Sequence, residues 1–471
     1  MSTLIRPLLV LITAIAIAQA GESNWPQFRG PGGLGLGSGK PPVEFNAGKN
    51  LLWQAEVPPG HSSPCIWGGR IFLTGLADGR LVTFCLDRAT GHELWRMVAP
   101  AEKIEATHHI GSPACPTPCS DGERVYAYFG SFGLLAYDLN GKEVWKKPLP
   151  APLVEFGTGA SPILAGGNVV IVSDQDVGSY LLAVDARTGA EAWRQERPGF
   201  LRSFSSPFLW RHDGSEELIV AGSISVRSYE VKDGHERWSA HGMARVSNAT
   251  PTAGEGVLIV SSWNVGGDEG ARVKVPPFED FLAANDRDHD GLLARSEFPG
   301  GPLKDRFSQI DVDKDGRVTR AEYDHMREMF DQAENQLFAI KPGGQGDITA
   351  THVLWKTNKH LPYVSSPLCY QGQVYAMKSG GLASCYEALS GTIRYQAERV
   401  DAPGDYYSSA IGANGCVYIA SQKGTVVVLV AGDTLKILAR NQIEEQIFAT
   451  PAILDGRIYL RAEKHLFAFG E

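Results

Sequence analysis

Short runs of apolar residues alternate with turn residues along most of the chain, and the pattern repeats at nearly constant intervals. In the stretch 161–193, apolar runs at 161–164, 168–173 and 180–184 precede a turn at 185–189 and one more short run. Runs of this length, rich in β-branched residues and bounded by Gly, Asp and Asn, favour β-strands. The stretch therefore predicts a unit of four short strands.

A serine or threonine, followed by proline in all copies but one, marks the start of each unit. The eight starts are Ser63, Thr117, Ser161, Ser206, Thr250, Ser366, Ser409 and Thr450. Successive starts are 54, 44, 45, 44, 116, 43 and 41 residues apart. Four-stranded units of about 40–45 residues are typical of propeller blades. The spacing predicts an all-β fold, an eight-bladed β-propeller with an insertion in the fifth blade.

The last repeat, 447–471, has room for only three strands. The segment Leu51–Val57 has the pattern of an outer strand, since its Leu-Leu-Trp-Gln resembles Val353–Lys356. We expect this segment to supply the missing strand, so that the two ends of the chain close a propeller spanning 49–471. Closure leaves no free sheet edge.

A turn followed by an aromatic residue recurs near the end of most repeats. In the third repeat it is Asp185, Gly189 and Trp193, and related triplets occur at Asp87, Gly91 and Trp95, Asp138, Gly141 and Trp145, Glu230, Gly234 and Trp238, and Glu387, Gly391 and Tyr395. Asp bonds within such a turn, and Gly takes the left-handed position. We expect the aromatic residue to pack one blade against the next.

These residues carry a resemblance to a known family. The segment Ala183–Trp193 resembles the tryptophan-docking repeat of the pyrroloquinoline-quinone (PQQ)-like propellers, and Asn24–Pro31 resembles the opening of an exported bacterial PQQ-like repeat family. The resemblance covers nearly the whole mature chain outside the insertion, and it implies a PQQ-like propeller. That repeat family includes quinoprotein dehydrogenases and also non-catalytic scaffolds, such as the outer-membrane assembly lipoprotein.

Two acidic loops, 286–297 and 311–322, lie inside the long step. Each has carboxylates at loop positions 1, 3, 5 and 12 and glycine at position 6, a spacing that wraps the backbone around one Ca²⁺ ion. Position 7 contributes its backbone carbonyl. The expected ligands of two Ca²⁺ ions are Asp286, Asp288, Asp290, Leu292 and Glu297 in the first loop, and Asp311, Asp313, Asp315, Arg317 and Glu322 in the second.

Apolar residues at helical spacing flank both loops. Phe278 and Phe281 precede the first loop, and Phe307 and Ile310 precede the second. Such spacing favours entering helices, each with one apolar face. The segment 266–336 therefore resembles a paired EF-hand, inserted as a small helical module in blade five.

Position 8 of the two loops is apolar, with Leu293 in the first and Val318 in the second. This suits a short strand pairing between the loops. Eight carboxylates crowded into the two loops repel one another without metal, so we expect Ca²⁺ to order this segment.

The N-terminus predicts export. Residues 1–20 resemble a signal peptide, with Arg6 before the apolar run 8–18 and small residues at 18–20. The run is short for a membrane span, which takes about 20 apolar residues. A Gly- and Pro-rich strap, 21–48, follows. We expect a periplasmic or extracellular protein with no membrane span after cleavage, and the net charge of −9 argues against a nucleic-acid surface.

A PQQ-dependent dehydrogenase, with the quinone in the propeller funnel, is the alternative function. Quinoprotein alcohol dehydrogenases typically carry two adjacent cysteines against the cofactor, whereas the seven cysteines here are all separated. The expected Ca²⁺ ligands also lie in the insertion rather than on funnel loops. We therefore favour a non-catalytic, Ca²⁺-binding scaffold and do not expect PQQ as a cofactor.

The segments that precede the first strands should converge at one mouth of the propeller. They carry Glu105, His108, His109, Phe156, Phe204, Tyr363, Asp405, Tyr406, Tyr407 and Gln446. Such side chains suit an unknown protein partner or envelope ligand, or they pack on one another at the ring entrance. The adjacent histidines should point oppositely on an extended segment, which disfavours a shared ion.

Overall fold

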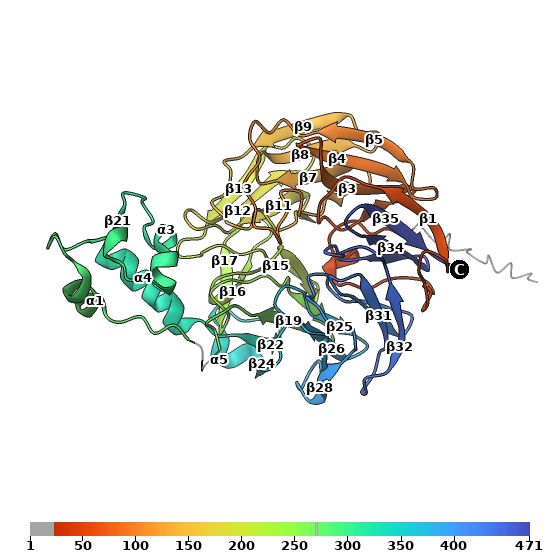
Figure 1. The fold of residues 1–471 in the computed structure, drawn as a ribbon. Coiled ribbons are helices and arrows are strands. Elements are labelled where there is room, and N and C mark those ends of the chain that lie inside the picture. Colours follow the sequence, from red (N-terminus) through yellow and green to blue (C-terminus); the bar gives the residue numbers. More distant parts are fainter. Residues whose placement is uncertain (1–22, 269, 271) are drawn as a thin grey trace, which may run out of the picture.

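The eight-bladed, all-β propeller predicted from the repeat is confirmed (Figure 1). The computed structural model describes residues 23–268, 270 and 272–471, so the predicted signal peptide, 1–20, lies outside the described residues. Apart from the insert, every blade is a four-stranded antiparallel sheet, and blade four carries one additional short strand. No helix in the described ranges is both long and apolar enough to cross a bilayer.

The first four blades follow the chain without interruption. Blade one contains β2 (Cys65–Trp67), β3 (Arg70–Ala77), β4 (Arg80–Asp87) and β5 (Glu93–Val98). Blade two contains β6 (Cys119–Ser120), β7 (Arg124–Phe129), β8 (Gly133–Asp138) and β9 (Glu143–Pro148). Blade three contains β10 (Ile163–Ala165), β11 (Asn168–Ser173), β12 (Tyr180–Asp185) and β13 (Glu191–Glu196). Blade four contains β14 (Phe208–His212), β15 (Ser215–Ala221), β16 (Ser225–Tyr229), β17 (Glu236–His241) and the parallel β23 (Gly346–Asp347).

The other four blades include the interrupted one and the one that closes the ring. Blade five contains β18 (Thr252–Gly254), β19 (Val257–Ser262), β22 (Gln336–Ile340) and β24 (Val353–Thr357), with α5 (Thr349–His352) before β24. Blade six contains β25 (Leu368–Tyr370), β26 (Gln373–Lys378), β27 (Leu382–Glu387) and β28 (Ile393–Arg399). Blade seven contains β29 (Ile411–Ala413), β30 (Cys416–Ala420), β31 (Thr425–Val430) and β32 (Ile437–Gln442). Blade eight contains β33 (Ala452–Leu454), β34 (Arg457–Arg461), β35 (His465–Phe469) and β1 (Leu51–Glu56).

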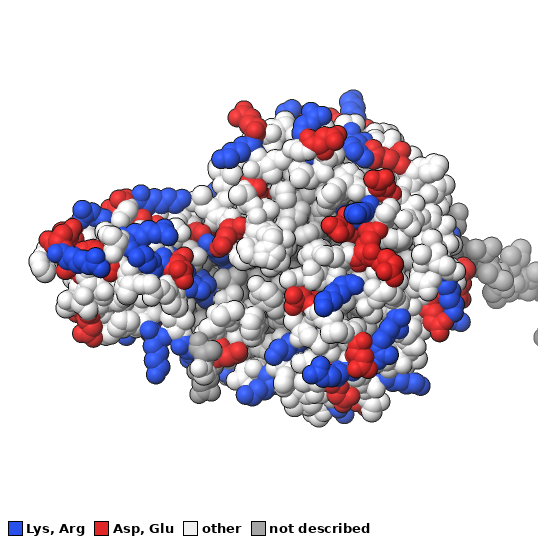
Figure 2. Space-filling view, in the orientation of Figure 1, with Lys and Arg blue, Asp and Glu red and all other residues white. Residues whose placement is uncertain are grey.

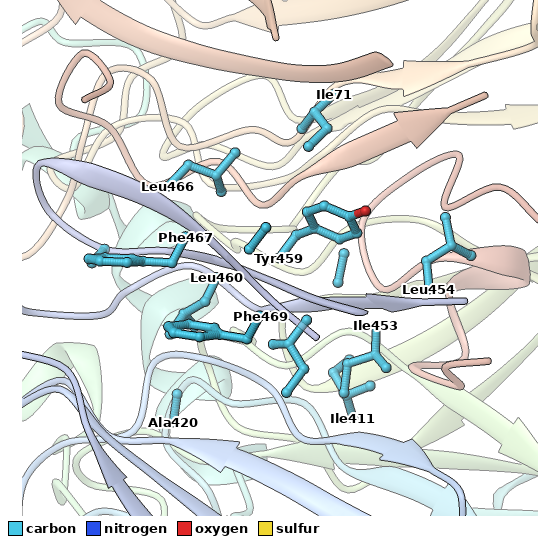
Figure 3. Packing of buried hydrophobic residues seen from close by; sticks show 14 of the residues in the cluster. Ile71, Ile411, Ala420, Ile453, Leu454, Tyr459, Leu460, Leu466, Phe467 and Phe469 are labelled. Carbon is cyan, nitrogen blue, oxygen red and sulfur yellow. The ribbon is translucent and has the colours of Figure 1, made fainter. Parts of the chain in front are cut away.

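The ring closes where strand β1 pairs antiparallel with β35, so the N-terminal strand lies beside the last strand of the chain (Figure 1). Apolar side chains pack between neighbouring blades at this junction. Figure 3 shows the rings of Phe467 and Phe469 one above the other, with Ala420 of blade seven below them. The centres of the two rings are 5.8 Å apart. The closing blade is therefore held by side-chain packing as well as by strand pairing.

The hydroxyls at the eight repeat starts form a closed circle of hydrogen bonds. In each blade the backbone N–H of the starting Ser or Thr donates to the side-chain hydroxyl of the next start, at 2.8–3.1 Å. The last bond, from the Thr450 N–H to Ser63 Oγ at 3.0 Å, joins blade eight to blade one. Because a buried N–H needs a partner, the circle explains why a hydroxyl residue recurs at this position.

Tryptophans link the outer parts of neighbouring blades, as the turn pattern predicts. The indole Nε1–H of Trp145 donates to the Ala186 carbonyl in the next blade at 3.0 Å, and its ring lies against Gly189. The equivalent bonds to the next blade are made by Trp53, Trp95, Trp193 and Trp355. Trp238 differs, because β23 covers its strand and its Nε1–H donates to Glu217 of the same blade at 2.7 Å.

The insert comprises residues 263–335 between β19 and β22 and projects from one side of the ring (Figure 1). Its elements are α1 (Phe278–Asn285), β20 (Leu293–Ala294), the 3₁₀ helix η3 (Arg295–Glu297), α2 (Pro302–Asp305), α3 (Phe307–Ile310), β21 (Arg317–Val318) and α4 (Arg320–Gln332). A further 3₁₀ helix, η1 (Pro31–Gly33), lies in the strap.

The helices of the insert are shorter than the sequence pattern suggests. The helix that enters the second loop is broken at Arg306 into two four-residue pieces, α2 and α3. The first loop ends in the single 3₁₀ turn η3, which does not continue into a longer helix among the described residues, because the backbone is already extended at Phe298.

Candidate metal loops and the mouth of the propeller

The two acidic loops of the insert have the same backbone shape. At loop position 4, His289 and Lys314 have φ of 58° and 60°, and at position 6, Gly291 and Gly316 have φ of 81° and 87°. Non-glycine residues rarely adopt such angles, so the paired outliers mark one shared tight turn. β20 and β21 pair antiparallel, with Leu293 opposite Val318, as predicted.

The first three carboxylates of each loop converge. One oxygen from each of Asp286, Asp288 and Asp290 lies within 4.8 Å of the others, and Asp311, Asp313 and Asp315 form the same arrangement. Backbone N–H groups inside the loops hold these side chains, and Gly291 N–H donates to Asp286 at 3.0 Å. Three hard oxygen donors at this spacing can share one divalent cation.

The glutamates at position 12 close each loop through the backbone. Glu297 accepts the N–H groups of Arg287 and Ala294, both at 2.8 Å. Glu322 accepts those of Val312 and Thr319, also at 2.8 Å. Each carboxylate therefore ties the start of its loop to the end, and hydrogen bonding to the charged form lowers the pKa of both glutamates.

Asp311 is a buried carboxylate of the second loop. Its Oδ2 accepts the Gly316 N–H at 3.1 Å, while its buried Oδ1 has no hydrogen-bond partner among the described residues. Burial raises the pKa of Asp311, and nearby carboxylates add to the rise. Since an unpaired buried carboxylate oxygen is costly, a cation bound at this position would stabilise the loop.

At position 7, Leu292 and Arg317 carry the backbone carbonyls assigned to the metal. The Leu292 N–H donates to Asp290 at 2.8 Å, and the Arg317 N–H donates to Asp315 at 2.8 Å. The Arg317 guanidinium also forms an ion pair with Asp290 of the other loop. This cross-loop contact offsets part of the negative charge, an arrangement the spacing alone did not indicate.

The insert is attached to the propeller by both apolar and polar contacts. Its core of aromatic and aliphatic residues includes Leu201 from the segment before blade four. The Arg245 guanidinium, from the segment before blade five, donates to the Gln309 side chain at 3.1 Å. Asn335 exchanges hydrogen bonds with Asn264 across the base of the insert. These contacts place α2 and α3 beside the centre of the ring.

A cavity of about 500 Å³ occupies the mouth and centre of the ring. Its walls include all eight hydroxyl residues of the hydrogen-bonded circle and Phe28 of the strap. Of the residues predicted at the mouth, those that line the cavity are Phe156, Phe204, Tyr363 and Tyr407, while Glu105, His108, His109, Asp405, Tyr406 and Gln446 do not. The insert contributes Asp305, Arg306 and Gln309, which the sequence did not single out.

One prediction about the mouth is wrong. The rings of His108 and His109 do not point apart but lie with their centres 4.0 Å from each other, and His108 also packs on Phe156 at 4.6 Å. The segment is not extended, because the chain turns at 109–110. The described residues provide no third metal-ligating side chain for this pair.

Eight four-stranded blades with tryptophan docking define a class, the PQQ-like β-propellers. A sequence profile for the family described as outer membrane protein assembly factor BamB matches residues 43–154 and 78–264. No curated protein matches. The comparisons and the repeat together support the fold of a PQQ-like β-propeller.

Solved structures share this fold at low sequence identity. BamB from Moraxella catarrhalis is 11% identical, with a TM-score of 0.56 over 89% of this chain and 98% of that chain. The quinohemoprotein alcohol dehydrogenase from Comamonas testosteroni is 13% identical, with a TM-score of 0.56 over 95% of this chain and 81% of the other. The computationally designed Ika8 protein is 10% identical, with a TM-score of 0.55 over 89% of this chain and 99% of that protein. These similarities define the fold and leave the activity open.

Proposed function

We propose that the chain is an exported, non-catalytic scaffold that binds two Ca²⁺ ions in an EF-hand pair inserted in blade five. The observation that carries the proposal is the matched geometry of the two loops, in which three aspartate oxygens converge above the same turn. Glu297 and Glu322 stand at the position that closes a Ca²⁺ loop, and Asp311 has a buried oxygen with no other partner in the described part of the chain. The residues fit a hard dication.

In this proposal the ions stiffen the insert. Without metal, the carboxylates of each loop repel one another, and folding of the segment is weakened. Extracellular Ca²⁺ modules have dissociation constants of about 10⁻⁴–10⁻³ M, which suits permanent occupancy outside the cell. Localisation in the periplasm or beyond rests on the predicted signal peptide and on the match to an outer membrane protein assembly factor.

The proposed scaffold role places a partner at the mouth of the propeller. The cavity is lined by aromatic rings, by hydroxyls and by charged residues from the insert. Binding sites commonly combine an apolar lining with a few convergent polar groups. The matched family is described as an assembly factor, which favours a protein partner over a small substrate.

A PQQ-dependent dehydrogenase remains the second candidate, because the Comamonas testosteroni enzyme has the same fold. None of the ten assigned Ca²⁺ ligands, all of which are described, lines the cavity. The assigned ligands would therefore not hold an ion against a quinone bound in the cavity. Purified protein mixed with PQQ and Ca²⁺ should oxidise no alcohol in a dye-linked assay, and clear turnover would replace the scaffold proposal.

Calorimetric titration of the mature protein tests the calcium proposal. We expect two equivalents of Ca²⁺ for the native chain, one for either single variant, Asp286→Ala or Asp311→Ala, and none for the double variant. Asp280→Ala, an exposed carboxylate on α1 outside both loops, is the matched control and should keep two equivalents. Binding that survives the double variant contradicts the assignment.

A further inference from the structure

Two arginines on opposite sides of the junction between insert and propeller face the mouth cavity without a carboxylate partner. Arg245 comes from the segment before blade five, and Arg306 lies between α2 and α3. Arg245 is only 7% exposed, and its guanidinium donates a hydrogen bond to the neutral side chain of Gln309. Arg306 donates to the Pro302 carbonyl at 2.8 Å. Within the described residues, neither arginine forms a salt bridge.

A third arginine in the same wall, Arg202, does have carboxylate partners. Arg202 holds Asp176 through two bonds of 2.6 Å each and Glu155 through one of 2.7 Å. Both of its carboxylates are therefore already engaged. Asp305, next to Arg306 in the chain, also lines the cavity but forms no salt bridge in the described structure. The charge of Asp305 acts favourably on Arg306, and that of Asp176 acts favourably on Arg245, but neither guanidinium has a carboxylate in direct contact within the described residues. Both guanidinium groups can therefore pair with an anionic ligand.

The two guanidinium groups lie within cation–π distance of the same aromatic ring, that of Phe330. The Cζ atom of Arg245 lies 5.5 Å from the centre of the Phe330 ring, and that of Arg306 lies 5.7 Å from the same centre. Burial lowers the pKa of Arg245 to about 10, and the positive charges of Arg306 and Arg202 contribute to the shift. Like charges held together in a partly buried site are unfavourable, and an anion between them would relieve the repulsion.

The kind of anion follows from the donors. A guanidinium is a planar fork whose N–H groups match the two oxygens of a carboxylate, and such charge-assisted pairs are strong when shielded from water. The remainder of the cavity is aromatic and hydroxyl-lined, with Tyr407 stacked on Phe448 at 5.4 Å. A carboxylate attached to a largely uncharged body fits both parts of the cavity.

We infer that the wall of the mouth cavity between insert and propeller binds a carboxylate group, with Arg245 and Arg306 as its cationic partners. The inference rests on the proposed role of the mouth as a docking site and names the chemistry that docks there. The carboxylate can belong to an acidic side chain of a partner segment or to a free organic acid. Because the insert supplies Arg306, the site is complete only when α2 and α3 keep their described position.

Isothermal titration of the mature protein in Ca²⁺ tests the inference with three probes. These are a blocked peptide with one glutamate among alanines, the same peptide with glutamine in place of the glutamate, and glutarate. Saturable binding of either carboxylate probe, with no binding of the glutamine peptide, is expected. Binding of the glutamate peptide alone identifies a partner segment as the source, and binding of glutarate alone identifies a free organic acid.

Variants locate the binding. Arg306→Gln, on the half-buried residue, and Arg245→Gln should each weaken the bound probe by at least tenfold, with unchanged circular dichroism. Arg187→Gln, on a residue whose side chain is 77% exposed in a turn of blade three, is the control and should have no effect. Carboxylate binding that is unaffected by Arg306→Gln, or absent for both carboxylate probes, overturns the inference.

A parallel Ca²⁺ titration separates this inference from the proposed function. If two Ca²⁺ ions bind but no carboxylate does, only the carboxylate site is wrong. If the glutamine peptide binds as well as the glutamate peptide, the mouth is a docking site but it does not recognise a carboxylate. If carboxylates bind without any Ca²⁺ uptake, the calcium proposal fails alone.

Discussion

The propeller and its insert are stabilised in different ways. In the propeller, the same contacts recur in blade after blade, and a circle of eight hydroxyl bonds joins all of them at the centre. The insert has one small apolar core and two loops whose carboxylates face each other. In Figure 2 the insert carries charged side chains over much of its surface, whereas the centre of the ring is mostly uncharged. If the calcium proposal holds, the ring should fold without ions, whereas the insert should depend on them.

Removal of Ca²⁺ should produce the largest contrast between the two regions. At about 10 mM Ca²⁺ and a dissociation constant of about 10⁻⁴ M, two sites stabilise the insert by about 5 kcal/mol in total. Chelation should therefore accelerate amide exchange in 278–332 by several orders of magnitude and leave the blade strands protected. Hydrogen-exchange mass spectrometry measures both regions in one sample. Equal acceleration in the blades would contradict the division.

Substitution of a docking tryptophan should have the opposite regional effect. Trp145→Ala removes a ring that is 8% exposed, together with its bond to the Ala186 carbonyl, and we expect a loss of about 4 kcal/mol in stability. Chemical denaturation of the ring measures this loss, while the Ca²⁺ stoichiometry should stay at its native value. Leu94→Ala, on an outer-strand residue that is 49% exposed, is the control and should change stability by less than about 0.5 kcal/mol.

A pair of glycines isolates the contact made by that tryptophan. Gly189 and Gly167 have φ of 72° and 79°, but a Cβ on Gly189 would lie 2.7 Å from the Trp145 ring, whereas a Cβ on Gly167 would meet nothing within 4 Å. Each alanine substitution should lower the stability by about 1 kcal/mol, because alanine is unfavourable at a positive φ. Gly189→Ala should be less stable than Gly167→Ala by about 2 kcal/mol in the same denaturation assay. Equal losses would show that blade docking tolerates the added methyl group.

The smallest effect should come from one hydroxyl of the central circle. Ser161→Ala leaves the buried Thr117 N–H without its acceptor, which should cost about 1–2 kcal/mol. Ser215→Ala, at an exposed position in blade four, is the matched control for the change of residue type. Identical unfolding curves for the two variants would mean that water replaces the lost acceptor.

The repeat pattern predicted the ring well because each blade reuses local signals. Ser161, Asp185 and Trp193 occupy equivalent places in their blade and in the others, so one repeat defines the pattern for eight. The pairing of Leu293 with Val318 was also predictable, because both hold the same loop position. Such features follow from spacing along the chain.

Contacts between repeats and the insert could not be predicted in the same way. Arg245 and Gln309 are 64 residues apart and belong to no shared pattern, so only the folded chain shows that they meet at the cavity. The arrangement of His108 and His109 was predicted wrongly because an extended segment was assumed where the chain turns. The break at Arg306, where φ is −106° and ψ is 12°, has no signal in the apolar period.

The hydrogen bond from Thr450 to Ser63 joins residues that are 387 positions apart in the chain. Strand β1 can complete its sheet only after β35 has been synthesised. Contacts so distant along the chain make folding slow, because a long loop must close before the contacts form. During synthesis, blade eight lacks one strand until β35 has been added. Deletion of β35 would remove the partner of β1 and expose the edge of β34, and exposed edges of this kind promote association between chains. The pairing of β35 with β1 is therefore the step that protects the finished ring from such association.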